Sequence, residues 1–515
     1  MTKKLWRLEA SIFVGIWFIL MVFARSSLFH DPGTFTHTVV GERILSTGQL
    51  IYTDPFSFTY GGKHWIAHQW LGECIMAFIH RIAGLDSLLL ATVTLLAFFY
   101  TWMAHRLVRA GIHPLLAILI ISLAAAASSY HFHVRPHLVT IVFLGLSLAM
   151  LCDFEAGRTP LGRLFCLVPL FLLWANIHGG FLGGMATLLL AAAGWIFSWL
   201  ASRESPITGI RQALVIVVII MACGLTAFVN PYGVELPKAW FSIINSPLLP
   251  QIIDEHAPLT SSKSAFAVMP FGLLYIAALI GVFPRRPRVT WLIPLVWLCL
   301  GWMRVRHAPL FATAFAIVLA DMLPHVRWVK WLAHRGSEVC KLRTAHQMEA
   351  SSRITITQAF IPVILILITI TFQVAGIRIP VFGSGWAKLD PTHWPVGLLE
   401  ELKGIESRSP NGTPIFNDFL YGGFLIYYTP GLRVFIDDRC ELYGDEWLSA
   451  YVNAEKAPAQ INRWAQEYGF EFALVQSASR FDSYLNESKN WSLLKRTDVA
   501  ALYRRDTEPH IALPH

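Results

Sequence analysis

Charged side chains are scarce in this chain, and the 39 residues from 164 to 202 contain none. Of the 515 residues, 14% are charged and 55% are hydrophobic, and the mean hydropathy is +0.51. This balance excludes an ordinary soluble protein and is typical of a polytopic membrane protein. The net charge of +8 would suggest nucleic acid as a partner for a soluble domain. Here the excess lies in short loops beside apolar segments, so membrane topology explains it and no nucleic-acid partner is expected.

Several common signatures of chemistry are also missing. The seven cysteines are scattered and form no CxxC pair, which argues against a disulfide framework and a zinc site. The chain has no Walker loop, no GxSxG and no GxGxxG after a strand. Nucleotide hydrolysis, serine hydrolysis and dinucleotide chemistry therefore lack their usual motifs.

Long apolar segments fill the first three quarters of the chain. A bilayer core about 30 Å thick needs about 20 apolar residues per helix. The segment 10–27 has a basic leader and also fits a signal peptide, but Ala24-Arg25-Ser26 is a poor cleavage site, so we expect a retained helix. Windows of this size predict about eleven spans, at 10–27, 86–104, 114–130, 138–152, 164–178, 181–200, 213–229, 268–283, 289–303, 308–323 and 354–377.

The character of the sequence changes near residue 380. Short β-type runs at 414–416, 433–436 and 470–475 alternate with helical stretches such as 460–468, and 491–503 resembles a terminal hairpin. We therefore expect a polytopic α-helical membrane domain at 1–379, with a large first loop at 28–85, and a soluble α/β domain at 380–515.

Charge divides the loops into two sets. Basic residues remain in the cytoplasm during insertion, so the basic loops predict a cytoplasmic N-terminus and an extracytoplasmic C-terminal domain. These basic loops contain Lys3, Lys4, Arg7, Arg106, Arg109, Arg158, Arg163, Arg203, Arg211, Arg285, Arg286, Arg288 and the run 327–353. The opposite loops contain the candidates for an outward-facing site: Asp31, His37, Asp54, His68, Arg135, His137, Asn176, His178, Asn230, Tyr232, Glu255, Arg304, Arg306 and His307.

The first outer loop is the best candidate for chemistry. Asp31 follows the first span where hydrocarbon gives way to headgroups, and a carboxylate partly removed from water is a better base. The alternative is that Asp31 caps a helix that starts near Thr34. Helical patterns at 36–45 and 70–82 predict two interfacial helices above the membrane. Together they would form a slot for a substrate with a lipid tail and a polar head.

Arginines on the outer side run against the charge rule and predict an anion site. Arg304 and Arg306, with Arg135, would bind a lipid phosphate, because guanidinium matches phosphate oxygens bidentately. The alternative is that they neutralise Asp31 or Glu255, and His178 alone is equally consistent with a core histidine. A divalent cation, Mg²⁺ or Mn²⁺, is a further expectation if its ligands converge: Asp31, Asp54, Glu255 and His68.

The whole chain resembles the GT-C glycosyltransferases that use polyprenyl-phosphate sugars. The resemblance is one of arrangement: an acid after the first span, a large first outer loop, many spans and an extracytoplasmic C-terminal domain. Local strings are similar to a bacterial subgroup of membrane proteins, namely Asp54-Pro55-Phe56-Ser57, His68-Gln69-Trp70-Leu71, 174–181, 230–233 and Val434-Phe435-Ile436-Asp437-Asp438-Arg439.

This resemblance implies a multi-pass enzyme of the bacterial inner membrane that moves a sugar from a polyprenyl-phosphate donor to a glycan, lipid or protein acceptor, with inversion. Asp31 would deprotonate the acceptor, and Asp54 and Glu255 are the other candidate catalytic acids. Many relatives carry two adjacent acids here, whereas His30 and Pro32 flank Asp31, so Glu42 or Asp54 would supply a second carboxylate. Two other functions stay open: a transporter or flippase of a lipid-linked glycan, and a non-catalytic scaffold for envelope assembly.

Overall fold

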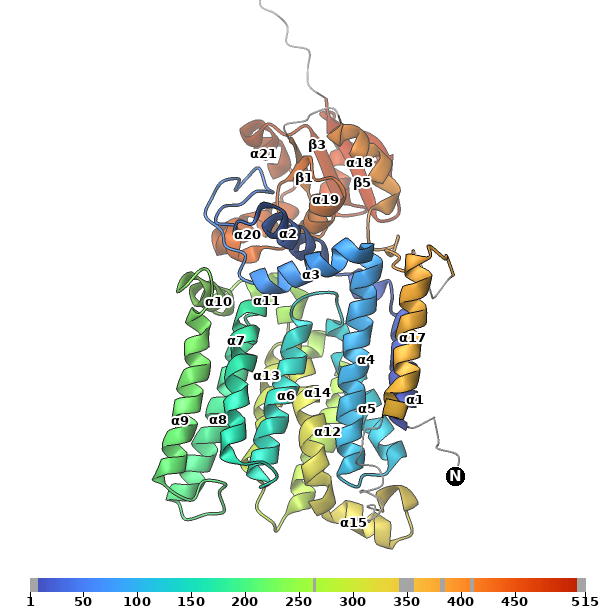
Figure 1. The fold of residues 1–515 in the computed structure, drawn as a ribbon. Helices are drawn as coiled ribbons and strands as arrows, with labels where there is room; N and C mark the ends of the chain where they lie inside the picture. The colour runs from blue at the N-terminus through green and yellow to red at the C-terminus, as the bar shows by residue number, and fades with distance from the viewer. Residues whose placement is uncertain (1–7, 263–264, 342–355, 380–384, 408–411, 507–515) are drawn as a thin grey trace, which may run out of the picture.

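A helical bundle and a small α/β domain stacked on one end of it make up the protein (Figure 1). The computed structural model describes residues 8–262, 265–341, 356–379, 385–407 and 412–506. The predicted domain boundary at 380 and the basic residues Lys3, Lys4 and Arg7 lie outside these ranges, as does part of the basic run 327–353. The expected division at 380 therefore stays a prediction.

The bundle helices coincide with the expected spans. In the described part of the chain, seven helices are long and apolar enough to cross a membrane, and four shorter apolar helices fall on the other expected spans. The count of about eleven spans therefore stays a prediction. The helices are α1 (Leu8–Phe23), α4 (Leu85–Arg109), α5 (Pro114–Ser128), α6 (Leu138–Glu155), α7 (Leu167–Ile177), α8 (Phe181–Leu200), α9 (Ile210–Leu225), α12 (Ala265–Val282), α13 (Val289–Met303), α14 (Ala308–Met322) and α17 (Ile356–Val374).

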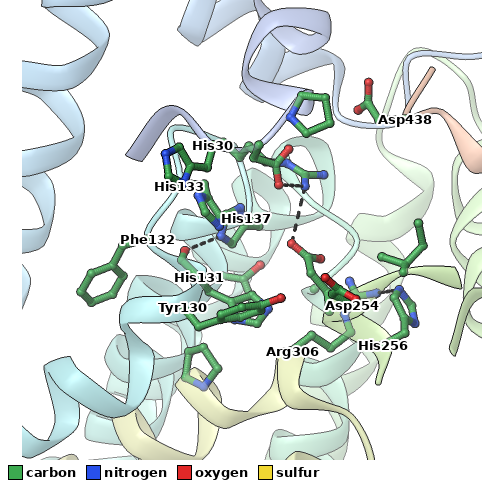
Figure 2. Close-up of a pocket in the computed structure, with 18 of the residues that line it drawn as sticks. His30, Tyr130, His131, Phe132, His133, His137, Asp254, His256, Arg306 and Asp438 are labelled. Carbon is green, nitrogen blue, oxygen red and sulfur yellow. Dashed lines mark hydrogen bonds and ion pairs between the residues drawn. The ribbon is translucent and has the colours of Figure 1, made fainter. Parts of the chain in front are cut away.

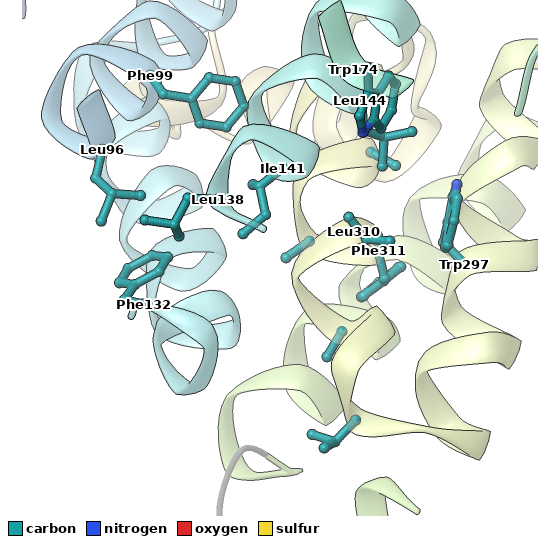
Figure 3. Close-up of a cluster of buried hydrophobic side chains, with 14 of the residues drawn as sticks. Leu96, Phe99, Phe132, Leu138, Ile141, Leu144, Trp174, Trp297, Leu310 and Phe311 are labelled. Carbon is teal, nitrogen blue, oxygen red and sulfur yellow. The ribbon is translucent and has the colours of Figure 1, made fainter. Parts of the chain in front are cut away.

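Helix α14 is the centre of the bundle. Almost all of its side chains are buried, as expected for a helix that is apolar on every face. Leu310 and Phe311 belong to the same buried cluster as Ile141 and Leu144 of α6 (Figure 3). This packing holds fixed the end of the bundle where α14 begins, directly after the turn that contains Arg304, Arg306 and His307.

Two helices of the first loop lie between the bundle and the α/β domain, α2 (Gly33–Thr47) and α3 (Trp70–Ala83). Helix α3 exposes Ile75, Phe78 and Ile82, as expected for a helix in the membrane interface. Helix α2 is instead largely buried between α3 and the α/β domain. Both expected helices are thus present, and their position in the membrane interface stays a prediction. Two short helices cover the same end of the bundle, α10 (Glu235–Asn245) and α11 (Leu249–Ile252), whereas α15 (Arg327–His334) lies at the opposite end.

The α/β domain is built on a five-stranded sheet with the order β2-β1-β3-β5-β4. Strand β1 pairs in parallel with β2 and β3, and the predicted terminal hairpin is present as the antiparallel pair β4–β5. The strands are β1 (Thr413–Asn417), β2 (Leu432–Val434), β3 (Phe472–Gln476), β4 (Trp491–Arg496) and β5 (Ala500–Arg505). The helices are α18 (Leu399–Glu406), α19 (Gly422–Tyr428), α20 (Cys440–Lys456), α21 (Gln460–Tyr468) and α22 (Arg480–Glu487).

The first loop joins this sheet along its β2 edge. Ser57 forms a parallel bridge with Val434, and the Phe58 N–H donates to the Val434 carbonyl at 3.1 Å. The Thr59 hydroxyl donates to the Phe435 carbonyl at 2.7 Å. These bonds cover an edge strand that would otherwise expose unpaired backbone groups. The α/β domain is therefore built together with the loop that contains Asp31.

Candidate functional site

A cavity of about 2110 Å³ lies between the bundle and the α/β domain, and most of the predicted site residues line it. Figure 2 shows Arg306, His256 and Asp254 on one side of this cavity and His131, His133 and His137 on the other. The structure thus brings together residues from loops that are far apart in sequence. The predicted site residues that line the cavity are Asp31, His37, His68, Arg135, His137, His178, Glu255, Arg304, Arg306 and His307.

Asp31 is held at the centre of an ion-paired group. Its Oδ2 lies 2.6 Å from Arg135 Nη1, and the same Nη1 lies 3.7 Å from Glu255 Oε1. The other oxygen, Oδ1, accepts the Gly33 N–H at 2.7 Å, so Asp31 also caps the start of α2. A Cβ at Gly33 would lie 2.9 Å from both Arg135 Nε and Asp31 Oδ1, so only glycine leaves room for this pair. Asp31 thus caps α2 and lies in the site as well, and its role as a base stays a prediction.

Glu255 is the second acid of this group. Burial alone would raise the pKa of Glu255, but the electrostatic effect of its neighbours His131, Arg135 and Arg306 holds that pKa well below its ordinary value. Glu255 is therefore a carboxylate at neutral pH. It comes from the loop between α9 and α12, so helices distant in sequence contribute charges to one point.

Arg304 and Arg306 project from the turn between α13 and α14. Arg306 Nη1 lies 2.5 Å from His256 Nε2, and burial and the neighbouring arginine lower the pKa of His256 to about 3. His256 is thus neutral and can accept this hydrogen bond. Among the described residues, Arg304 has no ion pair within 4.0 Å, although it lines the same cavity. The cavity therefore contains guanidinium groups whose positive charge is only partly neutralised by protein carboxylates.

Four predicted site residues lie outside the cavity lining. Asp54 pairs with the buried Arg439 at 2.7 Å and accepts the Ser57 N–H, which gives it a structural position between the first loop and the α/β domain. Asn176 accepts the Trp70 Nε1–H at 3.0 Å and donates to the Val229 carbonyl, so it joins three segments of the chain.

The remaining two belong to the turn after α9. Asn230 closes the turn by accepting the Tyr232 N–H at 2.8 Å and donating to the Gly233 carbonyl. Tyr232 is buried with its ring 5.3 Å from that of Tyr52. The positions of these four side chains therefore do not support the expected catalytic role of Asp54 or substrate contacts by the other three.

Several residues that line the cavity were not among the site residues predicted from the sequence. Asp438 of the α/β domain accepts the Thr36 hydroxyl at 2.6 Å, and burial raises its pKa to about 7. Asp438 interacts electrostatically with Asp31, and Glu255 shares Arg135 with it, whereas Glu42 pairs with Arg81 at 2.8 Å on the surface. The string 437–439 signalled a feature at this point, but only the fold shows which of its residues faces the cavity. Other missed lining residues are Glu73, Tyr130, His131, His133, His256 and Glu441.

The carboxylates do not form a dedicated metal site. In the part of the chain that the structure describes, no group of three His, Cys, Asp or Glu side chains is arranged to hold a metal ion. Asp31 and Glu255 share a guanidinium where a cation would have to lie, and Asp54 is paired elsewhere. The requirement for Mg²⁺ or Mn²⁺ stays a prediction.

Comparison with solved structures assigns the fold. The crystal structure of an oligosaccharyltransferase from Archaeoglobus fulgidus, tethered to an acceptor peptide containing the NVT sequon, is similar with a TM-score of 0.53. The match covers 92% of this chain and 69% of that chain at 13% identity. The chain has the GT-C fold. ArnT from Cupriavidus metallidurans, solved with undecaprenyl phosphate, matches over 98% of this chain and 99% of that chain at 12% identity, with a TM-score of 0.42. No protein-family model matches the GT-C chain described here, and no curated protein matches it in sequence.

Proposed function

We propose that this protein is an integral-membrane glycosyltransferase that moves a sugar from a polyprenyl-phosphate donor to an acceptor outside the cytoplasm. The observation that supports this best is the composition of one cavity. Apolar side chains of bundle helices line one part of it, and Asp31, Arg135, Glu255, Arg304 and Arg306 line the continuous polar part. A ligand with a long apolar tail and a phosphate head matches both parts.

The apolar part includes a groove between α1 and α5. Gly15 and Ile19 line it from α1, and Ser122, Ala125 and Ala126 line it from α5. On α5 these small residues are spaced by three and four and therefore share one face of the helix. A Cβ at Gly15 would meet no atom within 4 Å, so the groove is open at this point. We assign this groove to the polyprenyl tail.

The phosphate is assigned to Arg304 and Arg306. A phosphate that carries its charge into this cavity needs positive groups, and guanidinium donors suit its oxygens. Arg135 is the third guanidinium, and it pairs with Asp31 at 2.6 Å. An arriving phosphate competes for Arg135 and thereby weakens its hold on Asp31, which makes this carboxylate a better base in the donor complex.

The transfer step follows from these positions. The acceptor hydroxyl oxygen attacks the anomeric carbon while its proton passes to Asp31. The bond between the anomeric carbon and the phosphate oxygen breaks, and the phosphate leaves with the electron pair, stabilised by the arginines. Attack opposite the leaving phosphate inverts the anomeric centre. Asp31 later releases its proton to solvent, so the step is balanced without another reactant.

The test compares two variants with matched controls. We expect Asp31→Asn to lower sugar transfer by a factor of roughly 10² to 10⁴, the usual contribution of general-base catalysis, while the lipid phosphate still binds. Glu42→Gln removes an acid of the same loop that lies outside this cavity and should leave transfer unchanged. Arg304→Ala should weaken binding of undecaprenyl phosphate, whereas Arg109→Ala, at the far end of α4, should not.

Two outcomes would contradict the proposal. Full transfer by Asp31→Asn removes the base assignment. Translocation of a lipid-linked glycan across proteoliposomes by the wild-type protein, with no transfer to any acceptor, favours a transporter instead.

A further inference from the structure

Imidazole groups form one wall of the cavity beside Arg135, and the transfer step described above does not use them. This wall, which we call the imidazole wall, consists of His37, His137 and His178. The rings of His137 and His178 lie 6.4 Å apart. His37 is contributed by α2, whereas His137 and His178 flank α6 and α7.

His37 is fixed by a buried acid. His37 Nδ1 lies 2.8 Å from Glu73 Oε1, and the two residues are 6% and 2% exposed. Its other ring nitrogen, Nε2, is buried without a hydrogen-bond partner among the described residues. An unpartnered polar atom of this kind is costly in a native protein and calls for an explanation. Because His37 lines the cavity, a bound ligand is a natural partner for Nε2.

Hydrogen bonds also fix the tautomers of the other two rings, those of His137 and His178. His178 Nδ1 accepts the Gly180 N–H at 2.9 Å, so a neutral His178 has its proton on Nε2. His137 Nε2 lies 2.7 Å from the His131 carbonyl and must donate to it, which leaves Nδ1 as an acceptor. His137 Nδ1 is also buried without a partner among the residues that the structure describes. The wall therefore presents both a donor and an acceptor.

Charge distinguishes this wall from the arginines. Burial lowers the pKa of His37 and of His178 well below the ordinary value, and nearby Arg135 adds to the effect. Burial and Arg135 likewise lower the pKa of His137 to about 4. Neutral imidazoles that donate and accept hydrogen bonds suit hydroxyl groups, which also do both. A phosphate is better served by the guanidinium groups on the other side of the cavity.

We propose that the imidazole wall binds the hydroxyl groups of the transferred sugar and that Glu73 is a positioning residue that orients His37 for this contact. The inference rests on the proposed function, because it divides the same donor between two subsites. The arginines bind the phosphate, and the imidazole wall binds the sugar. A purely structural role is the competing explanation, since the Glu73–His37 pair also joins α3 to α2.

The experiment compares the binding of the lipid phosphate alone with the binding of the same lipid phosphate carrying a sugar. Purified full-length protein is titrated with undecaprenyl phosphate and, separately, with a panel of undecaprenyl-phosphate hexoses and pentoses. The wild-type protein should bind at least one glycosylated lipid more tightly than undecaprenyl phosphate itself. His37→Ala and Glu73→Ala should each reduce this advantage by roughly tenfold, equivalent to about 1.4 kcal/mol, without changing the affinity for undecaprenyl phosphate. Glu73→Gln should retain most of the advantage, because the amide can still hold the ring.

A second Glu–His pair provides the matched control. His64 Nε2 lies 3.1 Å from Glu235 Oε2 at the surface, outside the cavity, and His64→Ala should bind both lipids like the wild type. If Glu73→Ala does not fold, His178→Ala tests the same wall without disturbing the α2–α3 contact.

The outcomes separate this inference from the proposed function. Equal loss of affinity for both lipids in His37→Ala and Glu73→Ala would show a structural role and overturn the inference. So would a wild-type protein that binds undecaprenyl phosphate but gains nothing from any sugar. A wild-type protein that binds neither lipid overturns the proposed function itself.

Discussion

The Arg439 guanidinium joins carboxylates from two distant parts of the chain, and its removal gives the sharpest stability prediction. Arg439 lies 2.7 Å from Asp54 of the first loop and 2.6 Å from Asp437, with side-chain exposures of 4%, 0% and 0%. It also packs over the rings of Phe56 and Trp65, at 5.0 and 4.6 Å. Arg439→Met keeps an unbranched apolar side chain but leaves two buried carboxylates without a cation. Breaking a buried pair in this way costs about 3–5 kcal/mol, so we expect at least the lower value.

Thermal unfolding in detergent, followed by the loss of the monodisperse size-exclusion peak, measures this effect. With an unfolding entropy of about 2.1 cal/mol/K per residue, a loss of about 3 kcal/mol lowers the melting temperature of this 515-residue chain by roughly 3 °C. Arg81→Met breaks the exposed pair with Glu42 and should cost less than about 1 kcal/mol. Adding Asp54→Asn to Arg439→Met removes one unpaired charge and should recover part of the loss. A melting temperature of Arg439→Met equal to that of Arg81→Met would refute the reasoning.

Three further predictions concern other contacts. A Cβ at Gly41 collides with the Glu73 backbone, so Gly41→Ala should cost about 1–3 kcal/mol through forced separation of α2 and α3; an unchanged melting temperature contradicts this close contact. Glu155 accepts the first N–H groups of α13 at 2.8 and 2.9 Å, so Glu155→Ala should cost about 1 kcal/mol and Glu155→Gln less, measured in the same assay. Burial raises the pKa of Asp418 from 3.8, the value expected in the unfolded chain, to about 7 in the folded protein. The unfolded chain therefore loses the Asp418 proton at a lower pH than the folded protein does. The folded state consequently loses stability as the pH rises between these two values. From pH 5 to pH 7 the wild-type protein should therefore lose roughly 2–3 kcal/mol relative to Asp418→Asn, and parallel pH curves for the two would contradict this.

The bundle could be predicted from the sequence because apolar length is a direct physical requirement of the bilayer. The expected segments 181–200 and 289–303 are the exact bounds of α8 and α13. The expected helix 460–468 is likewise α21, where a strong amphipathic pattern ends at a glycine in the left-handed conformation, Gly469. In each case a local pattern and the tertiary environment favour the same element.

The position of α2 could not be predicted because four of its nine buried residues are polar. Thr36 donates to Asp438 and Thr38 donates to the Thr34 carbonyl, so burial is compensated by hydrogen bonds rather than by apolar contact. Such partners lie up to 402 residues away in the sequence, as for Thr36 and Asp438. Hydrophobic periodicity contains no information about contacts of this kind.

The sequence predicted which residues lie at the depth of the candidate site, but not which of them come together. Assigning loops to one side of a membrane collects every polar residue at that depth, so Asp31 and Arg304 were found together with Asn230, which only closes a turn. Conversely, Glu73 has the place of a solvent-facing acid on an amphipathic helix, yet it is 2% exposed because α2 covers it. Only the packing of α2 on α3 distinguishes the two cases.

The most direct test of the account is a structure of the full-length protein with undecaprenyl phosphate bound. We predict the phosphate against Arg304 and Arg306, with Asp31 in the same polar chamber and the tail in the groove between α1 and α5. Arg135 should then lie closer to the phosphate than to Asp31, whose Oδ2 is 2.6 Å from Arg135 Nη1 in the present structure. A phosphate bound outside this cavity, or a tail in contact with neither α1 nor α5, would contradict the central claim.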